Sequence, residues 1–466
     1  MMSMTISTLC FLSGILVFLN SSLLYSQGEF IKGADISFLQ QIEDNGGVFR
    51  ENGTTKDPLL ILKDHNINYI RLRLWNNPPR GYNNLSKLLI MARRIKQLNM
   101  KILIDFHYSD SWADPGKQNK PAAWIDLDST NLGDSLYNFT KEVLTSLKSQ
   151  NTFPDMIQIG NEITNGFLWN TGRIGSSFDT PTQWNNFTSL LKRCINAAND
   201  VKGNDTLQIM IHIDRSTDSS ACKWFFDNLN LYNVQFDCIG LSYYPWWHGT
   251  PEQVSANLNY LADRYNKELI ITETAYPWTL EWNDTTNNMV GSPSQLLAGY
   301  PATVAGQKSF ISNLISIVRS THLNLGKGIF YWEPLDITTP SFGSGWENLT
   351  FFDFNGNLLN SISAFEEPNL VKEETNTIRE FVLNQNYPNP FNPSTIIRFK
   401  FKTGTFASLK VFDVPGREVA LLFNGRVLAG KVYEVEFNGL GLSSGIYYYK
   451  LEGNEGAEIK KMILQK

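Results

Sequence analysis

Residues 155–163 read DMIQIGNEI and residues 269–276 read LIITETAY. Each stretch is a short run rich in isoleucine, as expected of a buried β-strand, and each run is closed by a glutamate, Glu162 in the first and Glu273 in the second. Buried strands that end in polar side chains are typical of barrels of parallel strands, whose chemistry lies at the carboxyl ends of the strands. These two stretches therefore set the fold that the rest of the chain has to complete.

Six more stretches of the same kind flank these two, and segments with apolar residues three and four apart separate them. The helical segments include residues 84–99, 135–150, 183–202 and 307–324. The eight expected strands are residues 30–37, 68–75, 100–109, 155–163, 207–214, 236–244, 269–276 and 327–334. Eight strand–helix alternations predict an α/β fold, a closed (β/α)8 TIM barrel.

A second, smaller unit is expected after the barrel, because 466 residues exceed one ordinary domain. The expected catalytic domain spans residues 28–365. Residues 366–380 are charged and poor in apolar side chains, and we interpret them as a linker. Residues 381–466 alternate apolar and polar positions between turns that contain Gly and Asn, which predicts a small all-β sandwich.

The first 27 residues resemble a signal peptide. Residues 5–24 are apolar and are followed by small polar residues around Ser26 and Gln27, as at a cleavage site. No Lys or Arg precedes the apolar run, so an uncleaved membrane anchor is the alternative. A cleaved signal peptide implies export.

Composition narrows the classes of partner and site. The chain has 40 Lys and Arg against 45 Asp and Glu and shows no basic stripe, so nucleic acid is not an expected partner. Cys10 would leave with the signal peptide, and the other cysteines lack metal-ligand spacing. We expect Cys194, Cys222 and Cys238 to be buried thiols.

Glu162 and Glu273 meet the chemical demand of glycosidic bond cleavage, which needs one carboxylic acid and one carboxylate. They close strands four and seven, which face each other across the barrel, so we expect the separation of about 5–5.5 Å that a retaining mechanism requires. We assign Glu162 as general acid/base and Glu273 as nucleophile. Tyr243 or Tyr244 is expected to donate a hydrogen bond that keeps Glu273 ionised. Two unrelated ion-paired carboxylates are the alternative.

Other side chains near the strand ends are expected to bind substrate. Asn161 precedes the acid/base, and at least one of Arg71 and Arg73 is expected to order the nucleophile, while the other fits ordinary ion pairing equally well. His107 is expected to hydrogen-bond a sugar or a catalytic partner, with a structural histidine as the alternative. The remaining candidates for sugar contact are the aromatic residues Trp112, Trp332, Trp346, Tyr243 and Tyr244, for which core packing is the other interpretation.

Several longer strings carry a resemblance to a known family. DFHYSDSWADPGKQNKPAAW, IQIGNEITNGFLW, GLSYYPWWHGT, ITETAYPWTLE and YWEPL, in this order, resemble glycoside hydrolase family 53, the endo-β-1,4-galactanases, across almost all of residues 29–365. The resemblance implies endo-cleavage, with retention, of the β-1,4-galactan in type I arabinogalactan and in pectin. It also implies Glu162 as acid/base and Glu273 as nucleophile. Another retaining endo-glycanase of the same clan, such as a mannanase, and a non-catalytic sugar-binding protein are the competing interpretations.

The resemblance also raises the question of a metal. No cofactor is required for the chemistry, but bacterial members of the family hold a structural calcium ion in a loop after strand seven. Here that loop keeps Asp284 and Asn288 and lacks the family's histidine. Oxygen ligands of this kind suit calcium, and a solvated polar loop is the alternative.

The C-terminal residues 383–466 resemble the sorting domain of the type IX secretion system, through NYPNPFNPSTIIRF and LSSGIYYYKLEGNEGAEIKKMIL. The resemblance implies the secretion machinery as a partner and a product that is secreted or attached to the outer cell surface. A carbohydrate-binding sandwich is the alternative for this unit. No stable protein partner is implied.

Overall fold

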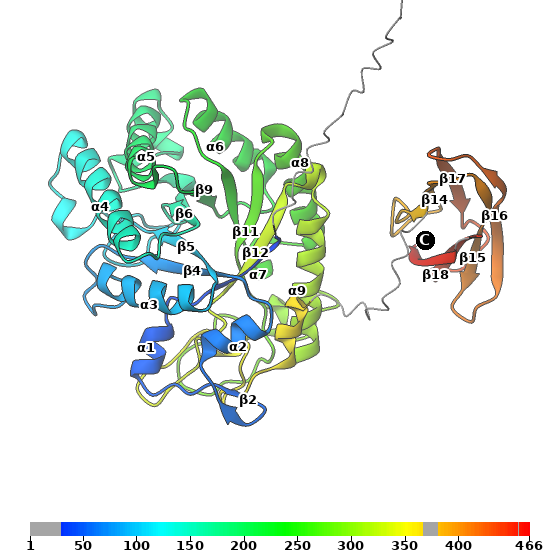
Figure 1. Cartoon of the computed structure of the whole chain (residues 1–466), viewed down its shortest axis with the longest axis horizontal. Helices are drawn as coiled ribbons and strands as arrows, with labels where there is room; N and C mark the ends of the chain where they lie inside the picture. The colour runs from blue at the N-terminus through cyan, green and yellow to red at the C-terminus, as the bar shows by residue number, and fades with distance from the viewer. Residues whose placement is uncertain (1–28, 367–380, 455) are drawn as a thin grey trace, which may run out of the picture. The chain divides into compact units, whose positions relative to one another are not determined.

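The computed structural model describes residues 29–366, 381–454 and 456–466. The described residues up to 366 form one compact unit, and those from 381 onward form another (Figure 1). The expected signal peptide and nearly all of the expected linker lie outside the described residues. Within the described part of the chain, no helix combines the length and the apolar character needed to cross a bilayer.

The first unit is a closed barrel of eight parallel strands in the order β1-β12-β11-β10-β9-β6-β5-β4. The TIM barrel prediction is therefore confirmed. The strands are β1 (Ile31–Asp35), β4 (Tyr69–Leu74), β5 (Lys101–Phe106), β6 (Met156–Ile159), β9 (Gln208–Ile213), β10 (Cys238–Tyr243), β11 (Glu268–Thr274) and β12 (Gly326–Trp332).

Helices surround the barrel (Figure 1). The long ones bury a row of mostly apolar side chains. They begin at polar caps: the Asp128 side chain accepts a hydrogen bond from the backbone N–H of Asn131, and Thr250 forms a capping box with Gln253. The helices are α1 (Leu39–Asp44), α2 (Pro58–Asp64), α3 (Leu85–Gln97), α4 (Ser129–Ser149), α5 (Pro181–Lys202), α6 (Ser219–Leu231), α7 (Pro245–His248), α8 (Pro251–Tyr265) and α9 (Val304–Arg319). The loops contain two short hairpins: β2 (Arg50–Glu51) with β3 (Thr54–Thr55), and β7 (Gly166–Phe167) with β8 (Gly172–Arg173).

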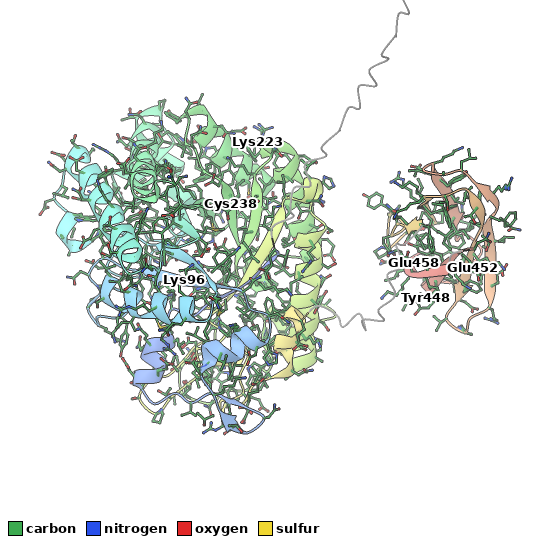
Figure 2. The ribbon with its side chains drawn as sticks, in the orientation of Figure 1. Lys96, Lys223, Cys238, Tyr448, Glu452 and Glu458 are labelled. Atoms are coloured by element: carbon green, nitrogen blue, oxygen red, sulfur yellow. The ribbon has the colours of Figure 1, made fainter. Side chains whose placement is uncertain are left out.

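An apolar layer closes the lower half of the barrel interior. Each of the eight strands contributes one buried side chain to it: Ile31, Tyr69, Leu103, Met156, Met210, Cys238, Ile270 and Phe330. Figure 2 shows Cys238 among the side chains that fill the barrel. Because side chains alternate along a strand, the next inward residues are two positions further on, and there they are largely polar: Arg71, Asp105, Gln158 and His212. The apolar layer thus forms a floor, and the polar side chains above it open toward the carboxyl ends of the strands.

The barrel strands end earlier than predicted, and for two of them the backbone conformation gives the reason. β6 ends at Ile159, not residue 163, because Gly160 and Glu162 have φ of +77° and +48°. β12 ends at Trp332, and Glu333 has φ of +50°. A left-handed residue cannot continue a strand, so both glutamates lie on the turn that leaves the barrel.

The second unit consists of two antiparallel sheets with the strand orders β13-β14-β17 and β16-β15-β18-β19, so the all-β prediction is confirmed. Its core includes Phe399, Leu409, Tyr449 and Met462. The alternation of apolar and polar positions predicts strands at residues 394–401, 408–414, 432–439, 446–453 and 457–464. Two strands lie outside these ranges: β13, which is short, and β16, whose register shifts against β15 disturb its alternation. The strands are β13 (Phe381–Leu383), β14 (Ser394–Phe401), β15 (Thr405–Asp413), β16 (Glu418–Val427), β17 (Val432–Asn438), β18 (Gly445–Gly453) and β19 (Gly456–Leu464).

Candidate active site

A pocket of about 310 Å³ opens at the carboxyl ends of the barrel strands. It brings together most of the side chains that the sequence singled out, including both glutamates. Its lining residues are Arg71, Arg73, Asp105, His107, Trp112, Ala113, Asp114, Asn161, Glu162, Tyr244, Trp247, Glu273, Met289, Trp332 and Trp346. The polar layer above the barrel floor therefore forms the base of this pocket.

A β-bulge turns Glu273 into the pocket. Along β11, Ile270 belongs to the apolar floor, so strict alternation would turn residue 273 outward. The register against β10 shifts here, however: Ile271 pairs with Leu241, and Glu273 pairs with the next residue, Ser242. One extra residue in β11 reverses the alternation after it, as bulges beside active sites commonly do.

Two donors hold the carboxylate of Glu273. Arg71 Nη2 lies 2.9 Å from its Oε1, and the Tyr244 hydroxyl donates to its Oε2 over 3.0 Å. Burial raises the pKa of Glu273 to about 7, while Arg71 and Tyr244 act in the opposite direction. The partners of Glu273 thus favour its ionised form.

Glu162 has a different environment. Its Oε1 accepts a hydrogen bond from the Ser242 hydroxyl over 2.6 Å, and no salt bridge to it exists among the described residues. Burial and the charges of Glu273 and Asp214 raise the pKa of Glu162 well above its usual range. These surroundings favour the proton on Glu162 and the negative charge on Glu273.

Arg71 is the hub beneath the two glutamates and is almost fully buried. Besides Glu273 it contacts Asp35 at 2.7 Å and Asp105 at 2.9 Å. Its Nη2 also donates to the side-chain oxygen of Asn161 over 2.9 Å, which fixes the amide next to Glu162. Burial would raise the pKa of Asp105, but Arg71 and His107 lower it to about 2. One guanidinium thus holds Glu273 directly and fixes the residue that precedes Glu162.

Arg73 has another role, which answers the question that the sequence left open. Its guanidinium lies over the rings of Trp112 at 4.0 Å and of Phe38 and Trp75 at 4.8 Å each. Its charged neighbour is Glu333, at 3.7 Å. Arg71 therefore orders the nucleophile candidate, and Arg73 supports the aromatic wall.

His107 lines the pocket, but the protein uses both of its ring nitrogens. Nδ1 accepts from the backbone N–H of Ala113 over 3.2 Å, so Nε2 carries the hydrogen and donates to Asp105 over 2.9 Å. The predicted hydrogen bond from His107 to a sugar therefore has no free nitrogen to use. Its contacts, with Asp105 and the Ala113 backbone, are those of the alternative that the sequence left open, a structural histidine.

Aromatic rings form one wall of the pocket. The centroids of Trp112 and Trp332 are 6.0 Å apart, and those of Trp332 and Trp346 are 4.5 Å apart. Trp346 is largely buried and its indole N–H donates to the backbone oxygen of Trp332. Trp247, which sequence reasoning passed over, lines the pocket with 58 % of its surface exposed. Such rings suit the apolar faces of pyranoses.

The prediction for Tyr243 is wrong. Its hydroxyl donates to the backbone oxygen of Gly249, and its ring stacks on Phe310 of α9, away from the pocket. Alternation along β10 explains this, because Ser242 and Tyr244 share the inward face and Tyr243 has the other. The same alternation, read backward from Tyr244, could have found Ser242, the partner of Glu162 that sequence reasoning missed.

The loop of the predicted calcium site has a hydrogen-bonded structure of its own. The Asp284 carboxylate accepts from the Thr338 hydroxyl and from the backbone N–H groups of Thr286 and Ser344. The Asn288 amide donates to the backbone oxygen of Glu281. No group of three His, Cys, Asp or Glu side chains suited to a metal occurs among the described residues. The side-chain oxygen of Asn288 is buried without a hydrogen-bond partner among the described residues, so one of the two predicted oxygen ligands is free, and the calcium site stays a prediction.

Comparisons with known proteins agree with this geometry. Residues 31–365 match the model of glycosyl hydrolase family 53, and residues 385–465 match that of the secretion system C-terminal sorting domain. An arabinogalactan endo-β-1,4-galactanase of Cellvibrio japonicus is 34 % identical over 335 residues, which cover 70 % of this chain and 86 % of that protein. An uncharacterised protein from the bgaB 5′ region of Niallia circulans is 46 % identical over 344 residues, covering 72 % and 93 %.

Solved structures show the same relationship. The family 53 catalytic domain of Ignisphaera aggregans superposes with a TM-score of 0.68 at 39 % identity and covers 72 % of this chain and 96 % of that one. A fungal β-1,4-galactanase superposes with a TM-score of 0.64 at 33 % identity, covering 72 % and 98 %. In both, the shared part is the size of the barrel unit.

Proposed function

Because the chain belongs to glycosyl hydrolase family 53, we propose that it cleaves β-1,4-galactosidic linkages within galactan chains, with retention of anomeric configuration. The enzyme is a glycoside hydrolase, and relatives named as galactanases, at 31 to 35 % identity, support the choice of substrate. Type I arabinogalactan and the galactan side chains of pectin are the polysaccharides that contain this linkage.

One observation carries the mechanism: two glutamates line the same pocket, and their surroundings favour opposite protonation states. Glu273 is held by a cation and a phenol, which favour a carboxylate, whereas Glu162 receives one hydroxyl and faces the charge of Glu273. A retaining glycosidase needs this division, with a protonated acid and an ionised nucleophile.

The reaction then proceeds in two displacements. A Glu273 oxygen attacks the anomeric carbon while Glu162 gives its proton to the departing glycosidic oxygen, and a glycosyl–enzyme ester forms. The ester carries no charge, so the charge of Glu273, one of the causes of the raised pKa of Glu162, is lost and that pKa falls. Glu162, now a carboxylate, takes a proton from water, the water oxygen bonds to the anomeric carbon, and Glu273 is released as a carboxylate.

Reducing-sugar release from linear β-1,4-galactan, with mannan, xylan and cellulose in parallel, tests the substrate. Glu162→Ala and Glu273→Ala test the roles, because azide in place of water should rescue the two variants differently. Glycosyl azide of retained configuration is expected from the Glu162 variant and of inverted configuration from the Glu273 variant. Preferred cleavage of another glycan would overturn the substrate, and exchanged azide products would reverse the two roles.

The C-terminal unit supports a second, separate proposal about location. Residues 385–465 match a secretion sorting domain, so the secretion machinery is the partner that we propose for this unit. The product would be secreted or attached to the outer cell surface. Fractionation of cells that express the chain with and without residues 381–466 tests this, because loss of the unit should leave galactanase activity inside the cell envelope.

A further inference from the structure

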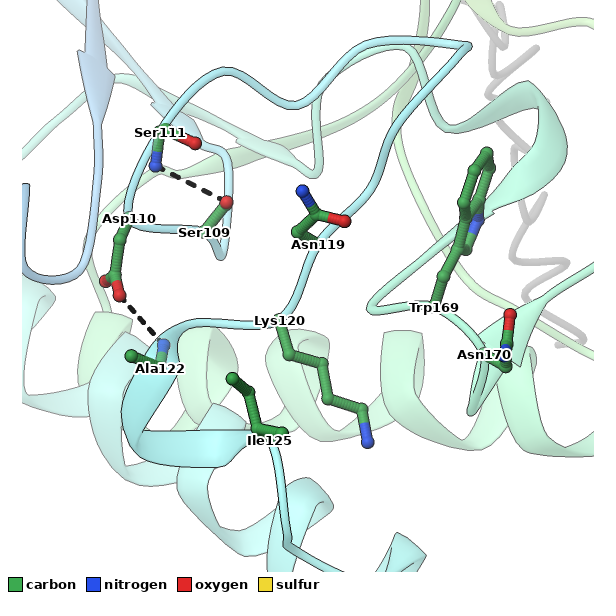
Figure 3. A pocket seen from close by; sticks show the side chains of 9 residues that line it. All are labelled: Ser109, Asp110, Ser111, Asn119, Lys120, Ala122, Ile125, Trp169 and Asn170. Atoms are coloured by element: carbon green, nitrogen blue, oxygen red, sulfur yellow. Dashed lines mark hydrogen bonds between the residues drawn. The ribbon is translucent and has the colours of Figure 1, made fainter.

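A second hollow, of about 570 Å³, lies beside the catalytic pocket and has no part in the mechanism above. It is built by the continuation of the two segments that carry catalytic-site residues. The loop after β5 passes from Trp112 to Asn119 and Lys120, and the segment after β6 passes from Glu162 to Trp169 and Asn170. In Figure 3 the Asn119 and Lys120 side chains lie between Asp110 on one side and Trp169 on the other.

The walls of this hollow are held in place by the protein. The Asp110 carboxylate accepts from the backbone N–H groups of Asn77 and Ala122, each over 2.8 Å. Trp169 is fixed at its indole N–H, which donates to the backbone oxygen of Asn165 over 3.0 Å, and at its backbone N–H, which donates to Gln118. The hollow is therefore formed before any ligand arrives.

Trp169 provides a platform of the kind that a sugar ring needs. The Arg173 guanidinium covers the ring at 4.2 Å from its centroid, and the indole is partly exposed where it lines the hollow. Because the ring is already immobilised, it loses little conformational entropy when a sugar binds, and its flat surface matches the apolar face of a pyranose.

Polar groups with unused hydrogen-bonding capacity surround this platform. Within the described part of the chain, the side chains of Asn119, Lys120 and Asn170 form no hydrogen bond or ion pair, although they border the same hollow. Two amides and an ammonium supply donors and acceptors for sugar hydroxyls. A fixed aromatic surface beside free polar groups is the composition of a carbohydrate subsite.

The position of the hollow indicates which part of a substrate would reach it. A third hollow, of about 410 Å³, shares Trp112 with the catalytic pocket and Asp110 and Ser111 with this one. The three hollows thus follow one another around the loop after β5, on the side of the barrel where the strands end. A polymer held at the two glutamates could continue along this path, whereas a short oligosaccharide could not.

We propose that this hollow, with Trp169 and Lys120, is a remote subsite for a neutral galactosyl residue of a long glycan chain. The proposal rests on the proposed function and adds to it a preference for polymeric substrate. Its energetic effect should appear in kcat/KM for long chains and be absent for chains that end before the hollow.

The test compares kcat/KM for linear galactan with that for the shortest galacto-oligosaccharide that the wild-type chain cleaves. In Trp169→Ala and in Lys120→Ala, the ratio of the two values is expected to fall about fivefold to tenfold, the effect of one stacked ring or one to two hydrogen bonds. Lys141→Ala, on the outer face of α4, is the matched control and should keep the wild-type ratio. Lys120→Ala keeps the test open if Trp169→Ala does not fold.

An unchanged ratio in folded Trp169→Ala and Lys120→Ala would overturn the proposal while leaving the galactanase function intact. A ratio that falls only with arabinose-branched galactan would show that the hollow binds a side branch, which also overturns the main-chain form. Failure of the wild-type chain to cleave any galactan would instead refute the proposed function itself.

Discussion

Replacement of Tyr244 by phenylalanine tests the assignment of Glu273 as nucleophile. The Tyr244 hydroxyl donates to Glu273 Oε2 over 3.0 Å and stabilises its charged form. Removing that donor raises the pKa of Glu273 above the value of about 7 that it has in the intact site. Because the nucleophile must be ionised, activity is lost as the pH falls through this pKa, and the acidic limb of the pH profile should move to higher pH.

The size of the shift follows from the contact. A hydrogen bond to a charged group contributes about 1.5–3 kcal/mol, and one pKa unit corresponds to about 1.36 kcal/mol. The acidic limb should therefore move up by roughly one to two units. Below both limbs, kcat/KM of the variant should be roughly 10- to 100-fold below that of the wild type. The loss should shrink as the pH rises past the shifted limb.

The assay is kcat/KM for galactan from pH 4 to pH 9, which reports the ionisations of the free enzyme. The apparent pKa values read from the limbs of this profile belong to the coupled pair Glu162 and Glu273, not to either residue alone. Tyr243→Phe is the matched control, because its hydroxyl contacts Gly249 outside the pocket and its loss should not move the acidic limb. An acidic limb that stays in place or moves to lower pH in Tyr244→Phe would refute the reasoning.

Three further predictions concern stability. Burial raises the pKa of Glu162 in the folded state, so the stability that this group contributes is present below its unfolded pKa and is lost as the pH rises through its folded pKa. Glu162→Gln should therefore raise Tm at pH 8 and hardly at pH 4, with roughly 2–4 °C for each kcal/mol of unfolding free energy. Equal shifts of Tm at the two pH values would contradict this. Arg71→Met leaves Asp105 and Glu273 without their cation and should cost about 3–5 kcal/mol in urea unfolding, and a loss below about 1 kcal/mol would be inconsistent with its role as hub. Chelation by EGTA should leave Tm within about 1 °C, since protein donors already satisfy Asp284; a larger drop that Ca²⁺ reverses would show that the chain binds calcium.

Most of the barrel could be predicted from the sequence because its strands are buried on both faces and therefore appear as unbroken apolar runs. The ends of those runs were less predictable. Nothing in the residues Gly160-Asn161-Glu162 indicates that Glu162 has a positive φ. That local backbone conformation ends β6 at Ile159. In the second unit, β16 escaped detection because its burial lacks the strict alternation of its neighbours.

The candidate site was predictable in its members and less so in their contacts. Chemistry alone selected the two glutamates, but alternation counted from Ile270 would have turned Glu273 outward, and only the bulge reverses it. The choice between Tyr243 and Tyr244 depended on which face of β10 points inward, which the sequence pattern left open. Trp169 drew no notice because a tryptophan within an apolar string is ordinarily core, and its setting is visible only once two loops meet.

The apolar floor of the barrel has a consequence for how such an enzyme can change over generations. Because each strand sends one side chain into that layer, packing there depends on all eight strands and on none of the loops. Loops at the open end of the barrel can then gain or lose aromatic and polar residues, and so change the glycan that the enzyme binds, without disturbing the packing of the strands. Substitutions meant to increase stability therefore belong in the apolar layer, and substitutions meant to change specificity belong in the loops at the carboxyl ends of the strands.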